Sequence, residues 1–176
     1  MPDRDSMPYR PCVGVALFNR NGQVFIGSRK LEGDPDNSAG HSAPWQMPQG
    51  GIDRNEEPLA AARRELWEET SVRSVQLLAQ TGDWLLYDLP DELLGIAFKG
   101  KYRGQRQLWF AFLFDGTDSE IDVANPGDGS VAAEFNAWRW EDLENLPDLI
   151  VPFKRDIYRE VVAAFAHLPA AIRQKS

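Results

Sequence analysis

The sequence predicts an α/β fold in which a mixed β-sheet carries a few helices on its faces. Short apolar segments of strand length, separated by turn residues, recur along most of the chain. Two longer segments, one after residue 58 and one after residue 151, instead have the composition or the spacing of helices. At 176 residues the chain is long enough for one domain with a sizeable core.

The first predicted element is a hairpin. Residues 12–18 (CVGVALF) and 23–29 (QVFIGSR) are apolar strands, and Asn21-Gly22 favours a tight turn between them. Residues 31–43 are polar and rich in Gly, Asp and Ser, which predicts a surface loop that is either a lid or a simple insertion. His41 in that loop is expected to be a solvated side chain rather than a ligand.

The next segment leads into a helix. Residues 45–49 predict a short strand that aims the loop at Gly50. Pro58 suits the first turn of a helix, where its missing N–H costs nothing. The residues that follow, LAAARREL, are good helix formers.

The second half of the chain predicts further strands and two helices. In order, we expect a strand pair or one bent strand over 75–89, a connection over 91–106, a strand over 108–114, a loop over 115–132 with a short strand at 121–123, a strand over 135–140, a short helix over 142–146 ending near Pro147, and a helix from 151. Apolar residues recur every four positions from Phe153 to Phe165, which indicates one buried helix face. Trp138 and Trp140 alternate on a strand, and one of them is expected in the core.

Charge and cysteine content narrow the class of function. The formal charge is −8, from 19 basic and 27 acidic residues, so a global basic field for tracking along RNA or DNA is excluded. An anionic substrate must therefore be bound locally, by metal ions and a few cationic side chains. Cys12 is the single cysteine, which fits a reducing compartment. Neither a secretory h-region nor an apolar run of membrane-spanning length is visible, so we expect a cytoplasmic protein with no membrane contact.

Three carboxylates follow Gly50 at helical spacing. Glu65, Glu68 and Glu69 are three and four residues apart, which places them on one helix face, where like charges repel. Three glutamates alone favour a solvated acidic face. Hard divalent cations such as magnesium take carboxylate oxygens and would offset the repulsion.

The complete spacing of residues 50–72 resembles the Nudix box, G-x5-E-x7-R-E-U-x-E-E-x-G-U, where U is a bulky apolar residue. The residues in register are Gly50, Glu56, Arg64, Glu65, Leu66, Glu68, Glu69 and Val72. The second glycine of the family is Ser71 here, a change that costs up to ~1 kcal/mol of backbone strain. The resemblance implies an α/β/α sandwich and a single Nudix hydrolase domain over 1–176. From the sequence itself we expect 1–8 and 169–176 to be flexible, with residues 170–176 as a frayed tail.

Segments outside the box resemble the branch of the family that contains RNA pyrophosphohydrolases and dinucleoside polyphosphate hydrolases. The matching segments are Tyr9-Arg10-Pro11, Val13-Gly14, residues 45–52, Trp84-Leu85 with Tyr87 and Leu89-Pro90, Gly104-Gln105 with Gln107 and Trp109-Phe110, Glu134-Phe135, residues 138–140, and residues 153–156 with Tyr158. Two departures are Ala133, where proline is common, and the longer 31–43 loop, which puts substrate preference in doubt.

This branch implies hydrolysis of the 5′-triphosphate end of RNA to a 5′-monophosphate with release of pyrophosphate. The alternative is cleavage of diadenosine tetraphosphate and related dinucleoside polyphosphates. The resemblance also implies Mg²⁺ as cofactor, with Mn²⁺ or another divalent cation as a substitute. A catalytically silent Nudix domain that binds a nucleotide is the rival of another class, and the complete glutamate set argues against it. The oligomeric state is open, with a monomer favoured.

The resemblance assigns roles to individual residues. It implies that Glu65, Glu68 and Glu69, with the carbonyl of Gly50, hold the metal ions. Glu134 matches a glutamate from beyond the box that lies near the metals. One box carboxylate or Glu134 should orient the attacking water. Glu56 and Arg64 are expected to brace the junction of loop and helix.

The same resemblance points to substrate contacts. The candidates for phosphate contact are Arg10, Arg29, Gln105 and Lys154. Tyr87 either touches phosphate through its hydroxyl or is an interior tyrosine. Phe153 either stacks on a base or belongs to the core stripe of the last helix. The cations at 99–106 either meet an RNA tail or solubilise a loop, and the loop is favoured.

Overall fold

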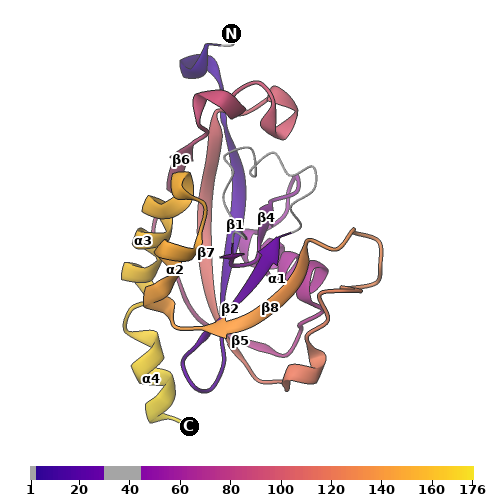
Figure 1. Ribbon diagram of the computed structural model, residues 1–176, viewed down its shortest axis with the longest axis vertical. Coiled ribbons are helices and arrows are strands. Elements are labelled where there is room, and N and C mark those ends of the chain that lie inside the picture. The colour runs from indigo at the N-terminus through magenta and orange to yellow at the C-terminus, as the bar shows by residue number, and fades with distance from the viewer. Residues whose placement is uncertain (1–2, 30–44) are drawn as a thin grey trace.

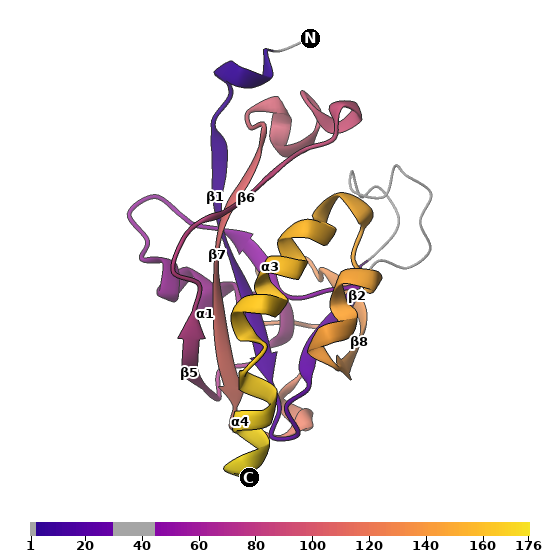
Figure 2. The ribbon, with the colours of Figure 1, turned by 90° about the vertical axis from the view of Figure 1, so that its left-hand side faces the viewer.

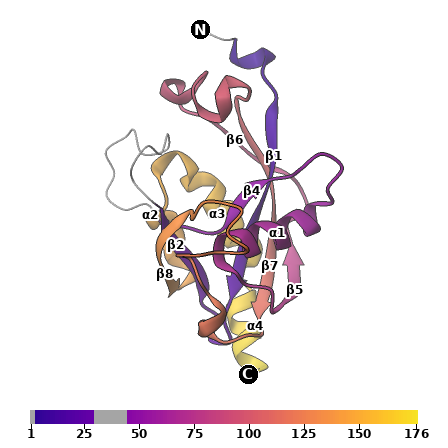
Figure 3. The same cartoon turned by 90° about the vertical axis from the view of Figure 1, so that its right-hand side faces the viewer.

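The structure is a computed structural model that describes residues 3–29 and 45–176. It confirms the predicted fold class, an α/β/α sandwich around a mixed sheet. Helices α2 (Leu146–Leu149), α3 (Arg155–Phe165) and α4 (Leu168–Gln174) cover one face of the sheet, and α1 (Pro58–Thr70) covers the other (Figures 1 and 3). The loop predicted over 31–43, with His41, lies outside the described residues.

The sheet is built around two long parallel strands, β1 (Tyr9–Phe18) and β7 (Gly104–Phe114). The order of the main path is β3-β2-β1-β7-β5. The other strands are β2 (Val24–Arg29), β3 (Trp45–Gln46), β4 (Gln49–Gly51) paired with β1, β5 (Val75–Gln80), β6 (Leu85–Asp88) paired with β7, and β8 (Phe135–Glu141) paired with β2. The carboxyl end of the short β4 leads directly toward α1. The pairing of β4 with β1 therefore fixes where the loop between β4 and α1 begins.

Several element predictions are confirmed. The first two strands form the expected antiparallel hairpin, with Phe18 opposite Val24, and Gly22 has a φ of 77° that suits glycine. The segment 75–89 is a pair of strands rather than one bent strand, and both pair with β7. The helix expected from 151 begins as a 3₁₀ turn over Pro152–Lys154 and continues as α3.

Strand β7 starts four residues earlier than the predicted 108, because its polar beginning is buried. Gln105 and Gln107 are both 2% exposed, and Nε2 of Gln107 donates to Oε1 of Gln105 at 2.7 Å. Satisfied hydrogen bonds allow such polar side chains to sit in a strand interior. An apolar pattern alone could not reveal this part of the strand.

Two predictions in the loop and tail regions are wrong. Residues 121–123 form no strand, because Ile121 and Val123 instead anchor an irregular loop in the core beneath α1. Residues 170–176 are not a frayed tail, because most of them belong to α4, whose Leu168 and Ile172 are buried. A third difference is smaller: Pro147, expected to end a helix, lies in the first turn of α2.

The core has one part on each side of the sheet. The larger part lies under α2, α3 and α4, and the other lies under α1. Figure 2 shows the helices on the two sides of the strands. Trp138 and Trp140 are both half-buried and both contact the ring of Phe25, so neither is the single core tryptophan that we expected.

At the N-terminal end, Arg4 to Ser6 form a 3₁₀ turn, and Nη1 of Arg4 donates to the carbonyl of Leu89 at 2.9 Å.

Among the described residues, no helix combines the length and the apolar character needed to cross a bilayer.

Candidate active site

Helix α1 carries the candidate catalytic carboxylates, and both of its ends fit the sequence. Pro58 occupies the first turn, as predicted. Ser71, at the other end, has a left-handed backbone with φ 68°, the conformation for which the family uses glycine. The Ser71 hydroxyl accepts a hydrogen bond from the N–H of Gly127 at 2.9 Å, and this contact offsets part of the strain.

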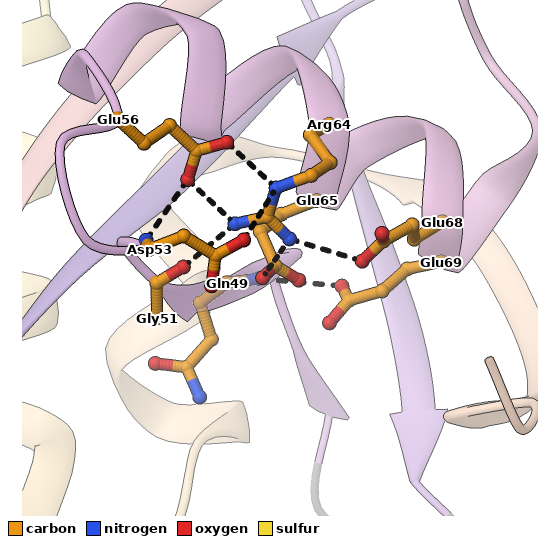
Figure 4. Close-up of polar contacts among 8 residues, drawn as sticks. All are labelled: Gln49, Gly51, Asp53, Glu56, Arg64, Glu65, Glu68 and Glu69. Atoms are coloured by element: carbon orange, nitrogen blue, oxygen red, sulfur yellow. Dashed lines mark hydrogen bonds and ion pairs between the residues drawn. The ribbon is translucent and has the colours of Figure 1, made fainter.

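Arg64 connects the loop and the helix, as the sequence predicted (Figure 4). Its Nε and Nη2 each donate to a carboxylate oxygen of Glu56 at 2.8 Å, and Nη2 also donates to the carbonyl of Gly51 at 2.9 Å. Hydrogen bonds from Arg64 lower the pKa of Glu56. The paired charges therefore hold the loop against the first turns of α1.

The same guanidinium reaches the acidic face. Nη1 of Arg64 donates to Glu65 at 2.8 Å and to Glu68 at 3.1 Å (Figure 4). Glu65 lies against Gly50 so closely that a Cβ at residue 50 would overlap its carboxylate. Glycine is therefore required at residue 50 by its contact with the helix.

Glu69 is the most buried of the carboxylates, at 7% exposed. One of its oxygens accepts a hydrogen bond from the N–H of Gln49 at 3.3 Å. Burial raises the pKa of Glu69 well above its ordinary value, and the nearby charges of Glu134 and Glu65 raise it further. Burial likewise raises the pKa of Glu65, although Arg64 opposes the shift. A divalent cation among these groups would relieve the repulsion.

A cavity of about 270 Å³ brings most of the predicted site residues together. The predicted residues that line it are Gly50, Glu65, Glu68, Glu69, Glu134, Arg10, Arg29, Gln105 and Lys154. Residues that the sequence did not single out also line it: Gln49, Gly51, Ala97, Phe98, Val131 and Ala132. Gln49 and Gly51 flank Gly50, a predicted metal-binding residue, so the sequence could have indicated them. Phe98 lies in a connection whose sequence has no distinguishing pattern.

The cavity wall opposite α1 is cationic. Nη2 of Arg29 lies 3.2 Å from a carboxylate oxygen of Glu134, and Lys154 is only 4% exposed. The ammonium of Lys154 lies 5.9 Å from the ring centroid of Tyr87 and 5.6 Å from that of Phe153. These side chains can balance the charge of a phosphate chain without a basic surface elsewhere.

Two predicted substrate residues, Tyr87 and Phe153, lie beside Lys154. Tyr87 is buried, and its ring centroid is 6.0 Å from that of the half-buried Phe153. Neither is among the described residues that line the cavity. The packing matches the interior alternative for Tyr87, which is buried. Phe153 packs on the core but stays partly exposed, so the choice between base stacking and core packing stays a prediction for this residue. Both rings contact Lys154.

The cations at 99–106 also lie apart from the cavity. Arg103 bonds Asp88 at 2.9 Å and stacks over Tyr9, and Arg106 stacks over Trp84. None of Lys99, Lys101, Arg103 and Arg106 is among the described cavity residues. This arrangement agrees with the favoured interpretation of these residues as the charges of a surface segment.

The donor chemistry of the cavity fits a hard divalent cation, because Glu65, Glu68, Glu69 and Glu134 all supply oxygen. Within residues 3–29 and 45–176, no three acidic, histidine or cysteine side chains converge as a ready-made metal site. Glu65 and Glu68 instead bond Arg64, and Glu134 pairs with Arg29. Each of these contacts engages one oxygen of the carboxylate, so the second oxygen of each could bind a cation.

In this α/β/α sandwich, carboxylates on one helix face and cationic side chains line the same cavity. This combination is typical of the hydrolases of phosphoric anhydrides. Comparison with known proteins identifies the family. A family model described as the NUDIX domain matches residues 8–161. The chain belongs to the Nudix family.

Similar proteins agree with this assignment. The chain is 60% identical over 166 residues to an RNA pyrophosphohydrolase of Mesorhizobium japonicum, covering 94% of this chain and 95% of that protein. An RNA pyrophosphohydrolase of Rhizobium meliloti is 57% identical over 164 residues, covering 93% and 97%.

Solved structures show the same fold. The chain resembles the E. coli dihydroneopterin triphosphate pyrophosphohydrolase with a TM-score of 0.60 and 19% identity, over 89% of this chain and 98% of that one. A C. elegans Ap4A hydrolase in a binary complex gives a TM-score of 0.59 at 16% identity, with the same coverage. At these identities the likeness concerns the fold alone.

Proposed function

We propose that this protein hydrolyses the 5′-triphosphate end of RNA to a 5′-monophosphate and releases pyrophosphate, with Mg²⁺ as the preferred cofactor and Mn²⁺ as a substitute. The observation that carries the proposal is the cavity in which four carboxylates face Arg10, Arg29 and Lys154. The names of the relatives from Mesorhizobium japonicum and Rhizobium meliloti support RNA as the substrate.

The residues divide the work by charge. Glu65, Glu68, Glu69 and Glu134, with the carbonyl of Gly50, would hold the divalent cation, which neutralises phosphate charge and acidifies bound water. Arg10, Arg29 and Lys154 would bind the phosphate oxygens, and Gln105 would donate its amide N–H groups. Glu56 and Arg64 lie outside this chemistry and keep the loop in place.

The reaction itself is an in-line displacement. Water attacks a phosphorus atom, the anhydride P–O bond breaks, and pyrophosphate leaves with the electron pair of that bond. A carboxylate of the set accepts the proton that the water loses. Burial of Glu69 and Lys154 removes water from around the reacting groups, which strengthens their interactions with the phosphates.

The proposal extends to the domain organisation, the oligomeric state and the compartment of the protein. We propose that residues 1–176 act as one domain and as a monomer in the cytoplasm. Buried Cys12, the single cysteine of the sequence, supports a reducing compartment. Recognition is local to the RNA end, since the chain carries a formal charge of −8.

Substitution of the carboxylates tests the assignment. Glu65→Gln and Glu69→Gln should each lower kcat on 5′-triphosphorylated RNA on the order of 100-fold or more, because charge that grips the cation is lost. Glu57→Gln is the matched control, since Glu57 precedes the same helix, is exposed and lies outside the cavity. Thermal unfolding of all three variants should stay cooperative. Full activity in both cavity variants would overturn the proposal.

The alternative function is cleavage of diadenosine tetraphosphate. The two substrates need the same carboxylates and cations, so the cavity alone does not rank them. Turnover of a 5′-triphosphorylated oligoribonucleotide and of diadenosine tetraphosphate should be measured side by side with Mg²⁺. We expect the higher kcat/KM on RNA, and a strong preference for the dinucleotide would reverse the order.

A further inference from the structure

Phe98 is the only aromatic side chain among the described residues that line the cavity. It is half-buried, so part of its ring packs on the core and part is accessible. The segment that carries it, residues 91–103, lies at the end of the molecule where β1 begins (Figure 2). The ring therefore enters the cavity from a different element than the acidic helix.

The backbone at Phe98 is held in an uncommon conformation. Phe98 has φ 53° and ψ 35°, and Lys99 has φ 59° and ψ 28°, both in the left-handed region. Two consecutive non-glycine residues rarely adopt it, and for a bulky side chain it is a genuine outlier. Buried Leu93, Leu94 and Ala97 anchor the segment. Such strain persists where surrounding packing imposes it, and it clusters at functional sites.

Arg10 connects this ring with the acidic face. Its guanidinium carbon lies 5.2 Å from the centroid of the Phe98 ring. The same guanidinium packs against Gly51, where it would contact an added Cβ at 2.5 Å. Gly51 follows the predicted metal-binding residue Gly50. A phosphate bound by Arg10 would therefore lie between the carboxylates and Phe98, and its nucleoside would lie beside the ring.

We propose that Phe98 is the stacking surface for the base of the nucleotide that carries the phosphate chain. Arg10 holds an adjacent phosphate and orients that nucleotide against the ring. Aromatic rings bind bases of any sequence in this way, because every base has a π-face. This inference rests on the proposed function and adds a contact to the nucleoside that neither the carboxylates nor the cations supply.

The experiment separates a base contact from simple packing. We would compare wild type and Phe98→Leu on two substrates, a 5′-triphosphorylated oligoribonucleotide and the same oligonucleotide with an abasic 5′ residue. Leucine keeps an apolar side chain but lacks a planar face. Phe98→Leu should lower kcat/KM on the base-bearing RNA about 10-fold, mainly through KM, and should leave the abasic substrate unchanged. Phe98→Tyr should restore wild-type values.

Controls make each outcome decisive. Ile96→Ala removes an exposed apolar side chain from the same segment, outside the cavity, and should change neither substrate. An equal loss on both RNAs in Phe98→Leu would show that Phe98 only packs, and no loss on either would show that no base contacts it; both refute the inference alone. A wild-type protein that cleaves neither RNA would instead refute the proposed function, and the stacking role with it.

Discussion

Glu56→Gln tests the bracing role of the Arg64 network. Glu56 accepts two hydrogen bonds from Arg64 at 2.8 Å and one from the N–H of Asp53 at 3.0 Å. Glutamine keeps one carbonyl oxygen, loses the charge, and presents an N–H group toward a guanidinium that also donates. A hydrogen bond to a charged group contributes about 1.5–3 kcal/mol.

The side chains of Glu56 and Arg64 are 17% and 25% exposed, so solvent screens the pair in part. We expect a loss of about 2 kcal/mol in the free energy of unfolding, the lower part of that range. For a chain of this size the loss corresponds to a fall of about 4–8 °C in Tm. Urea denaturation and calorimetry measure the two quantities, and kcat should change little because Glu56 does not line the cavity.

Asp53→Asn is the matched control. Its carboxylate lies 3.7 Å from Nε of Arg64 and is 76% exposed, so its removal should cost less than about 0.5 kcal/mol. If Glu56→Gln proved as stable as wild type, or if Asp53→Asn cost as much, the ion pair would not brace the loop.

The pH dependence of this effect has a definite sign. Arg64 lowers the pKa of Glu56 in the folded state, so its stabilisation is complete above the ordinary glutamate pKa of about 4.3. The stabilisation is lost as the pH falls through the lower, folded value. The difference in unfolding free energy between wild type and Glu56→Gln should be constant from about pH 6 to 8 and shrink below about pH 4.

Three further predictions concern the core. Tyr158→Phe removes the acceptor of the Met47 N–H, a buried bond of 2.9 Å, and should cost about 1–3 kcal/mol in urea denaturation; unchanged stability would show that the N–H finds another acceptor. Gly104→Ala would place a methyl group into the backbone carbonyl of Tyr87, so at least about 1–3 kcal/mol should be lost; wild-type Tm would refute this. Cys12 is fully buried and burial raises its pKa to about 11, so at pH 8 its thiol should react with alkylating reagents only as fast as the protein opens, and rapid labelling of native protein would contradict that.

Local features of the fold could be predicted because short-range rules decide them. The Asn21-Gly22 turn, the start of α1 at Pro58 and the common face of its glutamates depend on residues within a few positions of one another. The pairing of Arg64 with Glu56 also follows from their spacing at the loop–helix junction. The resemblance of this stretch to the Nudix box then led to the family that the comparison with known proteins shows.

Long-range packing decided the features that sequence patterns missed. α4 forms because Leu168 and Ile172 pack into the larger part of the core. The loop at Ile121 is irregular because its apolar side chains pack into the core under α1. Glu134 matched a family pattern, yet its pairing with Arg29 depends on strands distant in the sequence.

By itself, the sequence determined the acidic helix, its start at Pro58 and the family, because each depends on the order and spacing of neighbouring residues. Only the tertiary structure decided which cations face that helix, and only it brought Phe98 into the lining of the cavity and set Tyr87 and Phe153 beside Lys154. The physical reason is that a cavity is defined by side chains from separate elements, and the sheet pairing that brings those elements together is set by burial across the whole chain.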